Sequence, residues 1–172
     1  MQKLDRRKDR YLEIEHQGII GGHYFAPVSS ECICLYRDGY FIATVMMSHS
    51  INEGIIKFVA EKNGIERKKT DDTSKTVKDI IDELREKSII SNDCANAAIL
   101  ICRSYRNDIH HLNPTVAKID FKVLARQNLK CLSTIEREIF DFKINNGAIV
   151  PAQPKYWDIK SDGTTTTFLR LD

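Results

Sequence analysis

Apolar residues recur at helical spacing from about residue 30 to residue 63. Apolar or small residues are found there in steps of three and four, at Leu35, Gly39, Ile42, Met46, Ile56 and Ala60. Such alternation is the period of a helix that packs along its length against other helices. We therefore expect one long helix from about Ser30 to Asn63, capped by Ser29 or Ser30 and stopped near Gly64.

Two shorter helices are predicted next, after a charged stretch at 66–75 that has no apolar residue and indicates a loop. The first runs from about Thr76 to Lys87 and places Val77, Ile80, Ile81 and Leu84 on one side. The second begins at Ser91, with Asp93 in its first turn. We expect this helix to end before Pro114. Five of its side chains are expected to face the interior: Ala95, Ala98, Ile99, Cys102 and Tyr105.

The fourth helix has the most regular pattern and is expected over about 118–146. Its stripe repeats in steps of four and three, at Phe121, Ala125, Asn128, Leu132, Ile135, Ile139 and Phe142. Asn145-Asn146-Gly147 is a suitable C-terminal cap. Four helices with short or polar connections favour an antiparallel bundle.

The two ends of the chain show strand patterns instead. Residues 11–15 alternate apolar and polar, and 155–160 and 164–171 flank an Asp162-Gly163 turn, which predicts a β-hairpin. The predicted fold class is therefore all-α, a four-helix bundle with a small β appendage formed by the terminal segments. Residues 1–28 are expected to be an N-terminal extension with a short strand, 29–147 the bundle, and 148–172 a C-terminal hairpin extension.

Composition narrows the class of protein. The chain has 172 residues, 42% of them hydrophobic, which is enough for one buried core and excludes a disordered chain. A net charge of +2 excludes a uniformly basic nucleic-acid binder. No apolar run approaches the ~18–20 residues of a membrane-spanning helix, and residues 1–10 lack the apolar segment of a signal peptide. With an odd count of five cysteines, these features predict reduced thiols and a cytoplasmic location.

Residues 102–114 concentrate the groups most suited to chemistry. Two arginines, two histidines, an asparagine and an aspartate follow one another there: Arg103, Arg106, Asn107, Asp108, His110 and His111. Arg106 lies seven and four residues after Ile99 and Cys102, so a continuous helix would direct it towards the bundle. A charge in such a position needs a partner or a ligand.

Arg106 to His111 resembles the R-x4–6-H motif of the HEPN superfamily, the higher eukaryotes and prokaryotes nucleotide-binding domains. Arg106-Asn107-Asp108-Ile109-His110-His111 is an R-x4-H with a polar residue after the arginine, and Arg103 to His110 is a second frame. The motif lies between the third and fourth predicted helices, as in that family, and the resemblance covers about residues 29–147. It implies an HEPN-like bundle and a homodimer whose two motifs face each other.

The resemblance also implies an activity. Active members are metal-independent endoribonucleases, often toxins restrained by an antitoxin protein or effectors of phage defence, whereas others are non-catalytic dimerisation, nucleotide-binding or protein-binding modules. RNA cleavage of this kind uses the substrate's 2′-OH as nucleophile, histidine as acid or base, and arginine to hold phosphate. Arg106 would stabilise phosphate and His111 would move protons, with Asn107 assisting and His110 in reserve. Asp108 is the only carboxylate in the motif, so no metal or other cofactor is expected. The structural alternative is that the arginine and histidine side chains hydrogen-bond the free carbonyls at a helix C-terminus and interact favourably with the helix dipole.

Two further groups have a functional and a structural interpretation. His49 and Glu53 share one helix face and either support the motif or form a satisfied core or dimer contact. A basic stripe at four-residue spacing comprises Lys118, Lys122, Arg126 and Lys130. Together with Arg103, the stripe either binds the phosphate backbone of RNA or is a solvent-exposed helix face without a ligand. Two further basic clusters have the same two interpretations, one of Lys3, Arg6, Arg7, Lys8 and Arg10 and one of Arg67, Lys68 and Lys69. A purely structural bundle without a ligand is the remaining alternative.

Overall fold

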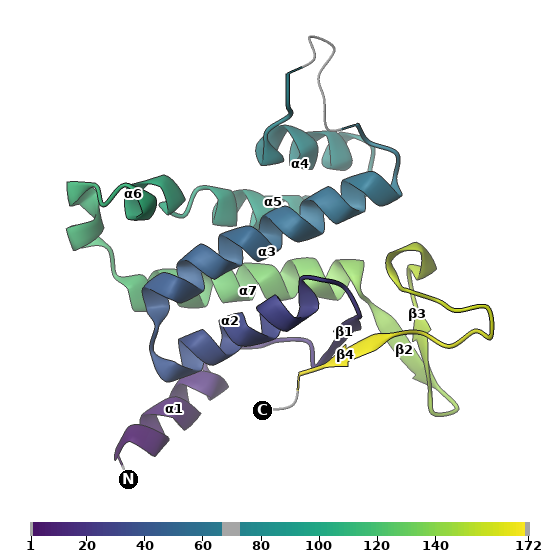
Figure 1. Cartoon of the computed structure of the whole chain (residues 1–172), viewed down its shortest axis with the longest axis horizontal. Coiled ribbons are helices and arrows are strands. Elements are labelled where there is room, and N and C mark those ends of the chain that lie inside the picture. The colour runs from purple at the N-terminus through teal and green to yellow at the C-terminus, as the bar shows by residue number, and fades with distance from the viewer. Residues whose placement is uncertain (1, 67–72, 171–172) are drawn as a thin grey trace.

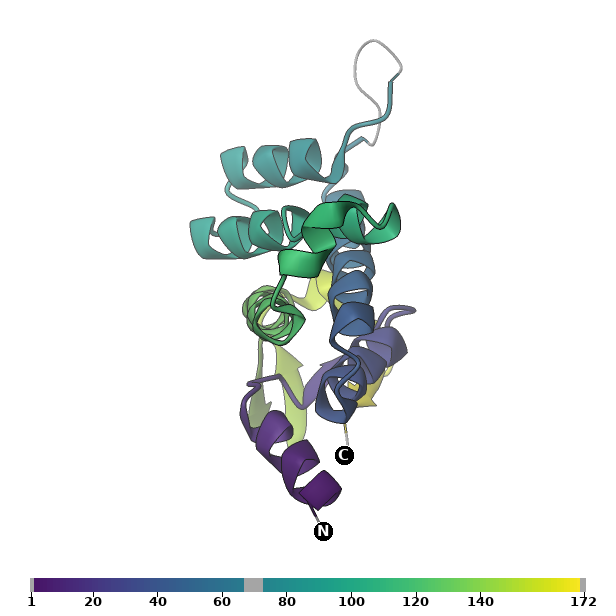
Figure 2. The same cartoon turned by 90° about the vertical axis from the view of Figure 1, so that its left-hand side faces the viewer.

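The protein is predominantly helical (Figure 1). The structure is a computed structural model that describes residues 2–66 and 73–170, so the basic cluster at 67–69 lies outside it. The helices are α1 (Gln2–Leu12), α2 (Ala26–Asp38), α3 (Phe41–Lys62), α4 (Val77–Glu86), α5 (Asn92–Cys102), α6 (Arg106–His110) and α7 (Phe121–Ile139). Figure 2 shows α4, α5 and α7 one below another with α3 beside them, and α3 contacts each of these three helices.

The single helix predicted over residues 30–63 is wrong, because Gly39 divides it into α2 and α3. Gly39 has a φ of +91°, and its N–H and that of Tyr40 bond back to the carbonyls of Tyr36 and Leu35. This is a left-handed helix ending that glycine adopts without steric cost. The three-four spacing continued through the glycine and concealed the break. Ser29 is not a cap but a buried residue within α2.

The next two helices begin where the sequence predicted. Thr76 forms a capping box with Asp79 at α4, and Ser91 accepts a hydrogen bond from the N–H of Cys94 at α5. The end predicted for the third helix is wrong, because α5 stops at Cys102. Tyr105 then takes a left-handed conformation with a φ of +60°, and the short α6 follows.

The fourth helix is confirmed in its centre and shorter at both ends than predicted. Pro114–Lys118 form a separate 3-10 turn, and α7 ends at Ile139. Phe142 belongs to strand β2 (Phe142–Asn145), which pairs antiparallel with β3 (Ala148–Pro151). Asn146 and Gly147, with φ of +49° and +79°, are therefore the two-residue turn of a hairpin and not a helix cap.

The terminal segments meet each other. Strand β1 (Ile19–Gly21) pairs antiparallel with β4 (Thr167–Leu169), whereas the strand predicted at 11–15 is wrong, since α1 extends to Leu12. The predicted turn at Asp162-Gly163 is present, with a bridge between Ile159 and Thr165, but β4 pairs with β1 and not with 155–160.

One hydrophobic core joins the helices and the terminal segments. Ile20, Phe140, Tyr156 and Trp157 are buried in the same cluster as α3, α5 and α7 side chains. The guanidinium of Arg170, near the end of the chain, is buried in an ion pair with Glu136 on α7. Within the described residues, no helix has both the length and the apolar character needed to cross a membrane.

Candidate functional site

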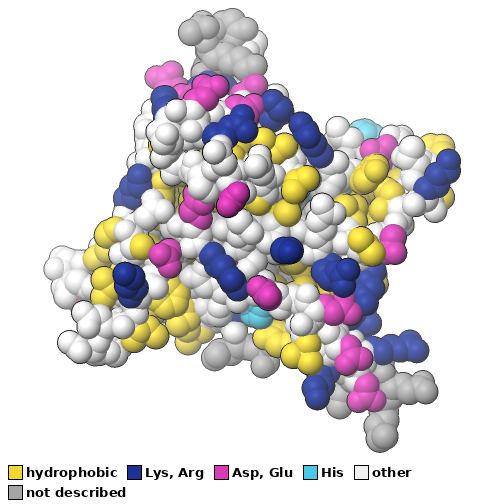
Figure 3. All heavy atoms as spheres, turned by 180° about the vertical axis from the view of Figure 1, so that it is seen from behind, with side chains coloured by type: hydrophobic (Ala, Val, Ile, Leu, Met, Phe, Trp, Pro, Cys, Tyr) yellow, Lys and Arg dark blue, Asp and Glu magenta, His cyan; other side chains and the backbone are white. Residues whose placement is uncertain are grey.

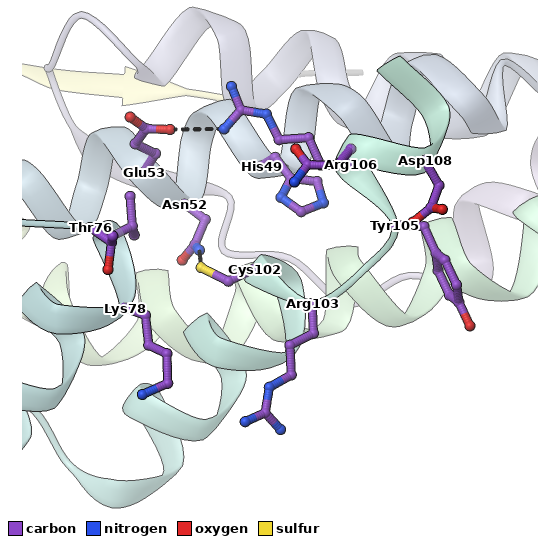
Figure 4. A pocket seen from close by; sticks show the side chains of 12 residues that line it. His49, Asn52, Glu53, Thr76, Lys78, Cys102, Arg103, Tyr105, Arg106 and Asp108 are labelled. Atoms are coloured by element: carbon purple, nitrogen blue, oxygen red, sulfur yellow. Dashed lines mark hydrogen bonds and ion pairs between the residues drawn. The ribbon is translucent and has the colours of Figure 1, made fainter. Parts of the chain in front are cut away.

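An open cavity of about 350 Å³ lies where α3 meets the junction of α5 and α6 (Figure 4). Its lining includes six residues that the sequence singled out, and these come from two separate segments of the chain: His49, Glu53, Arg103, Arg106, Asn107 and Asp108. The tertiary structure therefore brings most of the motif's polar groups to one concave surface.

Arg106 is the first residue of α6 and extends towards α3. Its Nη1 donates to Oε2 of Glu53 at 3.1 Å, and its side chain is 50% exposed. The prediction that Arg106 faces the bundle interior is wrong, because the left-handed Tyr105 ends the helical register before it. An ion pair this exposed is worth roughly 0–1 kcal/mol, so an anionic ligand can displace Glu53 at little cost.

Glu53 is shared between two cations. Lys57 donates to its Oε1 at 2.5 Å, and this hydrogen bond, followed by that from Arg106, lowers the pKa of Glu53. The carboxylate stays ionised at neutral pH and neutralises one of the two charges. Lys78, Arg103 and Asp108 line the same cavity, and Lys78 pairs with Asp82 at 2.7 Å, so Arg103 is the cation of the lining that no carboxylate of the described residues pairs.

His49 belongs to a buried polar network beneath the cavity. Its Nε2 lies 2.9 Å from Oγ of Ser104 and 3.3 Å from the Ser104 carbonyl oxygen, and Asn128 on α7 donates to the same hydroxyl at 2.9 Å. Burial lowers the pKa of His49, so its ring is neutral at pH 7. The network fixes Ser104, the residue that precedes the left-handed Tyr105.

Sequence reasoning missed Ser104 and Tyr105 as parts of the site. The available signal was Asn128, a polar residue within the apolar stripe of the fourth helix, which needs a buried partner. Asn52 is a similar case, since its Nδ2 donates to the Ala98 carbonyl and to Sγ of Cys102. Burial raises the pKa of Cys102, so this cysteine is an uncharged thiol and a poor nucleophile.

His110 and His111 lie at the opposite end of α6 from Arg106 and do not line the cavity. Both are exposed, and their ring centroids are 5.0 Å apart. At 100° per residue, His110 lies about 40° around the helix from Arg106 and His111 about 140°. Within one chain, His110 therefore shares the face of Arg106 more closely than His111 does.

Asp108 stabilises the turn that follows α6. It accepts hydrogen bonds from Nδ2 of Asn113 at 3.1 Å and from Oγ1 of Thr115 at 2.9 Å, and these two bonds lower its pKa. Among the described residues, no three His, Cys, Asp or Glu side chains converge as the ligands of a metal ion.

The predicted basic stripe is divided in the structure. Lys122 pairs with Glu13 at 2.8 Å and Arg126 lies 4.0 Å from the same carboxylate, while Lys118 is in the 3-10 turn and not on α7. Lys130 lines a separate groove of about 510 Å³ along α7. Figure 3, which views the molecule from behind, shows cationic and anionic side chains interspersed on that face.

The chain shows no similarity to a known protein in three comparisons. No family model matches it, and no curated protein or solved structure matches it either.

Proposed function

We propose that this protein is a metal-independent endoribonuclease built on an HEPN-like bundle of α3, α4, α5 and α7. The arrangement of the helices supports the bundle. The helices α4 and α5 pack together, α5 packs on α7, and α3 contacts all three. The Arg106 to His111 motif occupies the connection between α5 and α7, which are the third and fourth helices of this set.

One observation carries the proposed activity. Arg106 is half-exposed, pairs with the exchangeable carboxylate of Glu53 and faces an open cavity, while the exposed His110 and His111 lie at the C-terminal end of the same short helix. Arginine offers a planar fork of donors to phosphate oxygens. Histidine exchanges protons near neutral pH. These are the two kinds of group that RNA cleavage by its own 2′-OH requires.

The reaction follows from these groups. A phosphate of the RNA replaces Glu53 on Arg106, and Asn107 donates to a second phosphate oxygen. A histidine takes the proton of the 2′-OH as this oxygen attacks phosphorus. A second histidine gives a proton to the departing 5′-oxygen, leaving a 2′,3′-cyclic phosphate and a 5′-hydroxyl.

A second copy of the chain completes this site in the proposal. Acid and base act on opposite sides of the phosphorus, whereas His110 and His111 are adjacent at one helix end. Two-fold symmetry brings a second motif without further sequence. Leu112, which is 80% exposed directly after His111, offers an apolar contact for such a partner. In a toxin or phage-defence system, an antitoxin protein that covers the cavity would restrain this activity.

A non-catalytic module that binds nucleotide or protein is the second candidate. Two observations favour it: neither His110 nor His111 lines the cavity, and Arg106 is paired with Glu53. Such a module would bind a phosphate-bearing ligand at Arg106 and leave it intact.

The deciding experiment incubates purified protein with labelled RNA in the presence of EDTA. We expect cleavage that leaves 2′,3′-cyclic phosphate ends, and a loss of about 10²–10⁴-fold in rate for Arg106→Ala and for His111→Ala. His110→Ala reports which histidine acts in each chain. Arg85→Ala is the matched control, because Arg85 is also a partly exposed arginine beside a carboxylate, 2.7 Å from Asp82, and lines neither the cavity nor the α7 groove.

Three results would contradict the proposed activity. These are intact RNA after incubation with the wild-type protein, cleavage that needs added Mg²⁺ or Mn²⁺, and cleavage of an all-DNA strand. Binding of the RNA without cleavage would favour the non-catalytic module. A monomer of about 20 kDa by light scattering at high concentration would contradict the two-fold site.

A further inference from the structure

Tyr105 projects an aromatic ring into solvent between two hollows of the surface. It lines the cavity of about 350 Å³ that contains Arg106, and it also lines a second open hollow of about 420 Å³ beside Lys118 and α7. The residue is 47% exposed. Among the described residues, nothing hydrogen-bonds its hydroxyl or stacks against its ring.

The backbone that holds this ring is strained and firmly anchored. Tyr105 has a φ of +60°, a conformation that a bulky side chain rarely adopts. The preceding Ser104 is buried and bound by His49 and Asn128, and the Tyr105 carbonyl accepts from the N–H of Ile109. Strain that the surroundings hold in place is typical of functional positions. The prediction that Tyr105 turns inward is wrong, because α5 ends at Cys102 and the left-handed Tyr105 leaves its side chain exposed.

Cationic groups lie on both sides of the ring. Arg103 lines the first hollow and Lys118 the second, and within the described part of the chain neither forms an ion pair. In Figure 4, Arg103 and Tyr105 extend to one side while Arg106 extends towards Glu53. Three carboxylates line the two hollows, and each is already bound: Glu53 by Lys57 and Arg106, Asp108 by Asn113 and Thr115, and Asp120 by the N–H of Val123 at the start of α7.

We infer that Tyr105 is a stacking platform for one unpaired base of RNA, with Arg103 and Lys118 holding the phosphates on either side of it. This inference rests on the proposed function and names the form of its substrate. Every base has a π-face, so a tyrosine beside cations binds single strands with little sequence preference. Bases inside an A-form duplex are already stacked and cannot reach the ring. Tyr105 is thus a positioning residue that sets a phosphate against Arg106.

The test measures binding separately from cleavage, with a fluorescent single-stranded RNA whose 2′-oxygens are all methylated. Tyr105→Asn removes the ring, and asparagine tolerates a positive φ better than tyrosine, so the variant stays folded. We expect Kd to rise about 5- to 150-fold, the range for loss of one stacked base. Tyr105→Phe should bind within about twofold of wild type. Tyr40→Asn is the control, because Tyr40 is 64% exposed, caps α3 and lines neither hollow.

A kinetic measurement separates positioning from chemistry. With cleavable RNA, Tyr105→Asn should raise KM and leave kcat nearly unchanged, whereas Arg106→Ala should lower kcat. Wild-type affinity in Tyr105→Asn, absence of binding by the wild-type protein, or equal affinity for duplex RNA would overturn the platform. Binding that depends on Tyr105 in a protein that does not cleave RNA would support the platform and contradict the proposed enzyme. Cleavage of RNA that Tyr105→Asn does not affect would support the proposed enzyme and contradict the platform.

Discussion

Replacing Arg170 by methionine should destabilise the protein severely, although only two residues follow Arg170 in the sequence. Its side chain is 1% exposed and that of Glu136 is 2% exposed. The guanidinium donates to both oxygens of Glu136, at 2.9 and 2.7 Å, to Oγ of Ser29 at 2.7 Å and to the Gln17 carbonyl at 3.1 Å. The substitution leaves the Glu136 carboxylate buried with Ser29 as its remaining donor.

The magnitude follows from this burial. Removing one partner of a buried ion pair costs about 3–5 kcal/mol, because the other charge is left without compensation. For a chain of this size, each kcal/mol lowers Tm by roughly 2–4 °C, so we expect a fall of roughly 6–20 °C. Within the described residues, Nε of Arg170 is buried without a partner, which is a cost that the native pair already carries. The double variant Arg170→Met, Glu136→Leu should therefore recover most of the loss.

Urea unfolding followed by circular dichroism measures all four corners of this double-mutant cycle. Arg137→Met is the matched control, since Arg137 is 55% exposed beside Glu15, and it should change the free energy of unfolding by less than about 1 kcal/mol. A cost of less than about 1 kcal/mol for Arg170→Met, or a double variant no more stable than the single one, would contradict the stated role of the buried ion pair.

Three other outcomes can be measured with single substitutions. Gly39→Ala should cost about 1–2 kcal/mol in urea unfolding, because alanine must adopt a φ of +91°, and an unchanged midpoint would contradict this. Burial lowers the pKa of His23, so the stability it supplies is complete above about pH 6.5 and is lost as pH falls through its lowered native value. His23→Gln should show a flatter stability profile between pH 7 and 5. In RNA titrations, Lys130→Gln should reduce the salt slope by about 0.7, and Lys122→Gln should reduce it less, because Lys122 pairs with Glu13; equal slopes would contradict the division of the stripe.

Local sequence signals determined the parts of the fold that depend on neighbouring residues. Thr76 and Ser91 start α4 and α5, because a side-chain oxygen three residues before a free N–H caps a helix in any context. The stripe of α7 predicted that Ala125, Leu132 and Ile135 are buried, and they are. The Arg106 to His111 segment stood out by composition alone.

Some segments have a local sequence that suits two different structures, and there tertiary contacts decide which one forms. Asn146-Gly147 suits a helix cap or a hairpin turn, since both use positive φ, and the pairing of β2 with β3 selects the turn. Gly39 is tolerated within a helix, and only the packing of α2 against α3 requires the break there.

The candidate site shows the same division. The sequence named Arg106, Glu53 and His49, but it could not show that Arg106 reaches Glu53, because this depends on the left-handed Tyr105 between α5 and α6. That conformation is held by Ser104 through groups 55 residues earlier and 24 residues later in the chain. Contacts over such distances leave no periodic pattern in the sequence, so only the folded structure shows them.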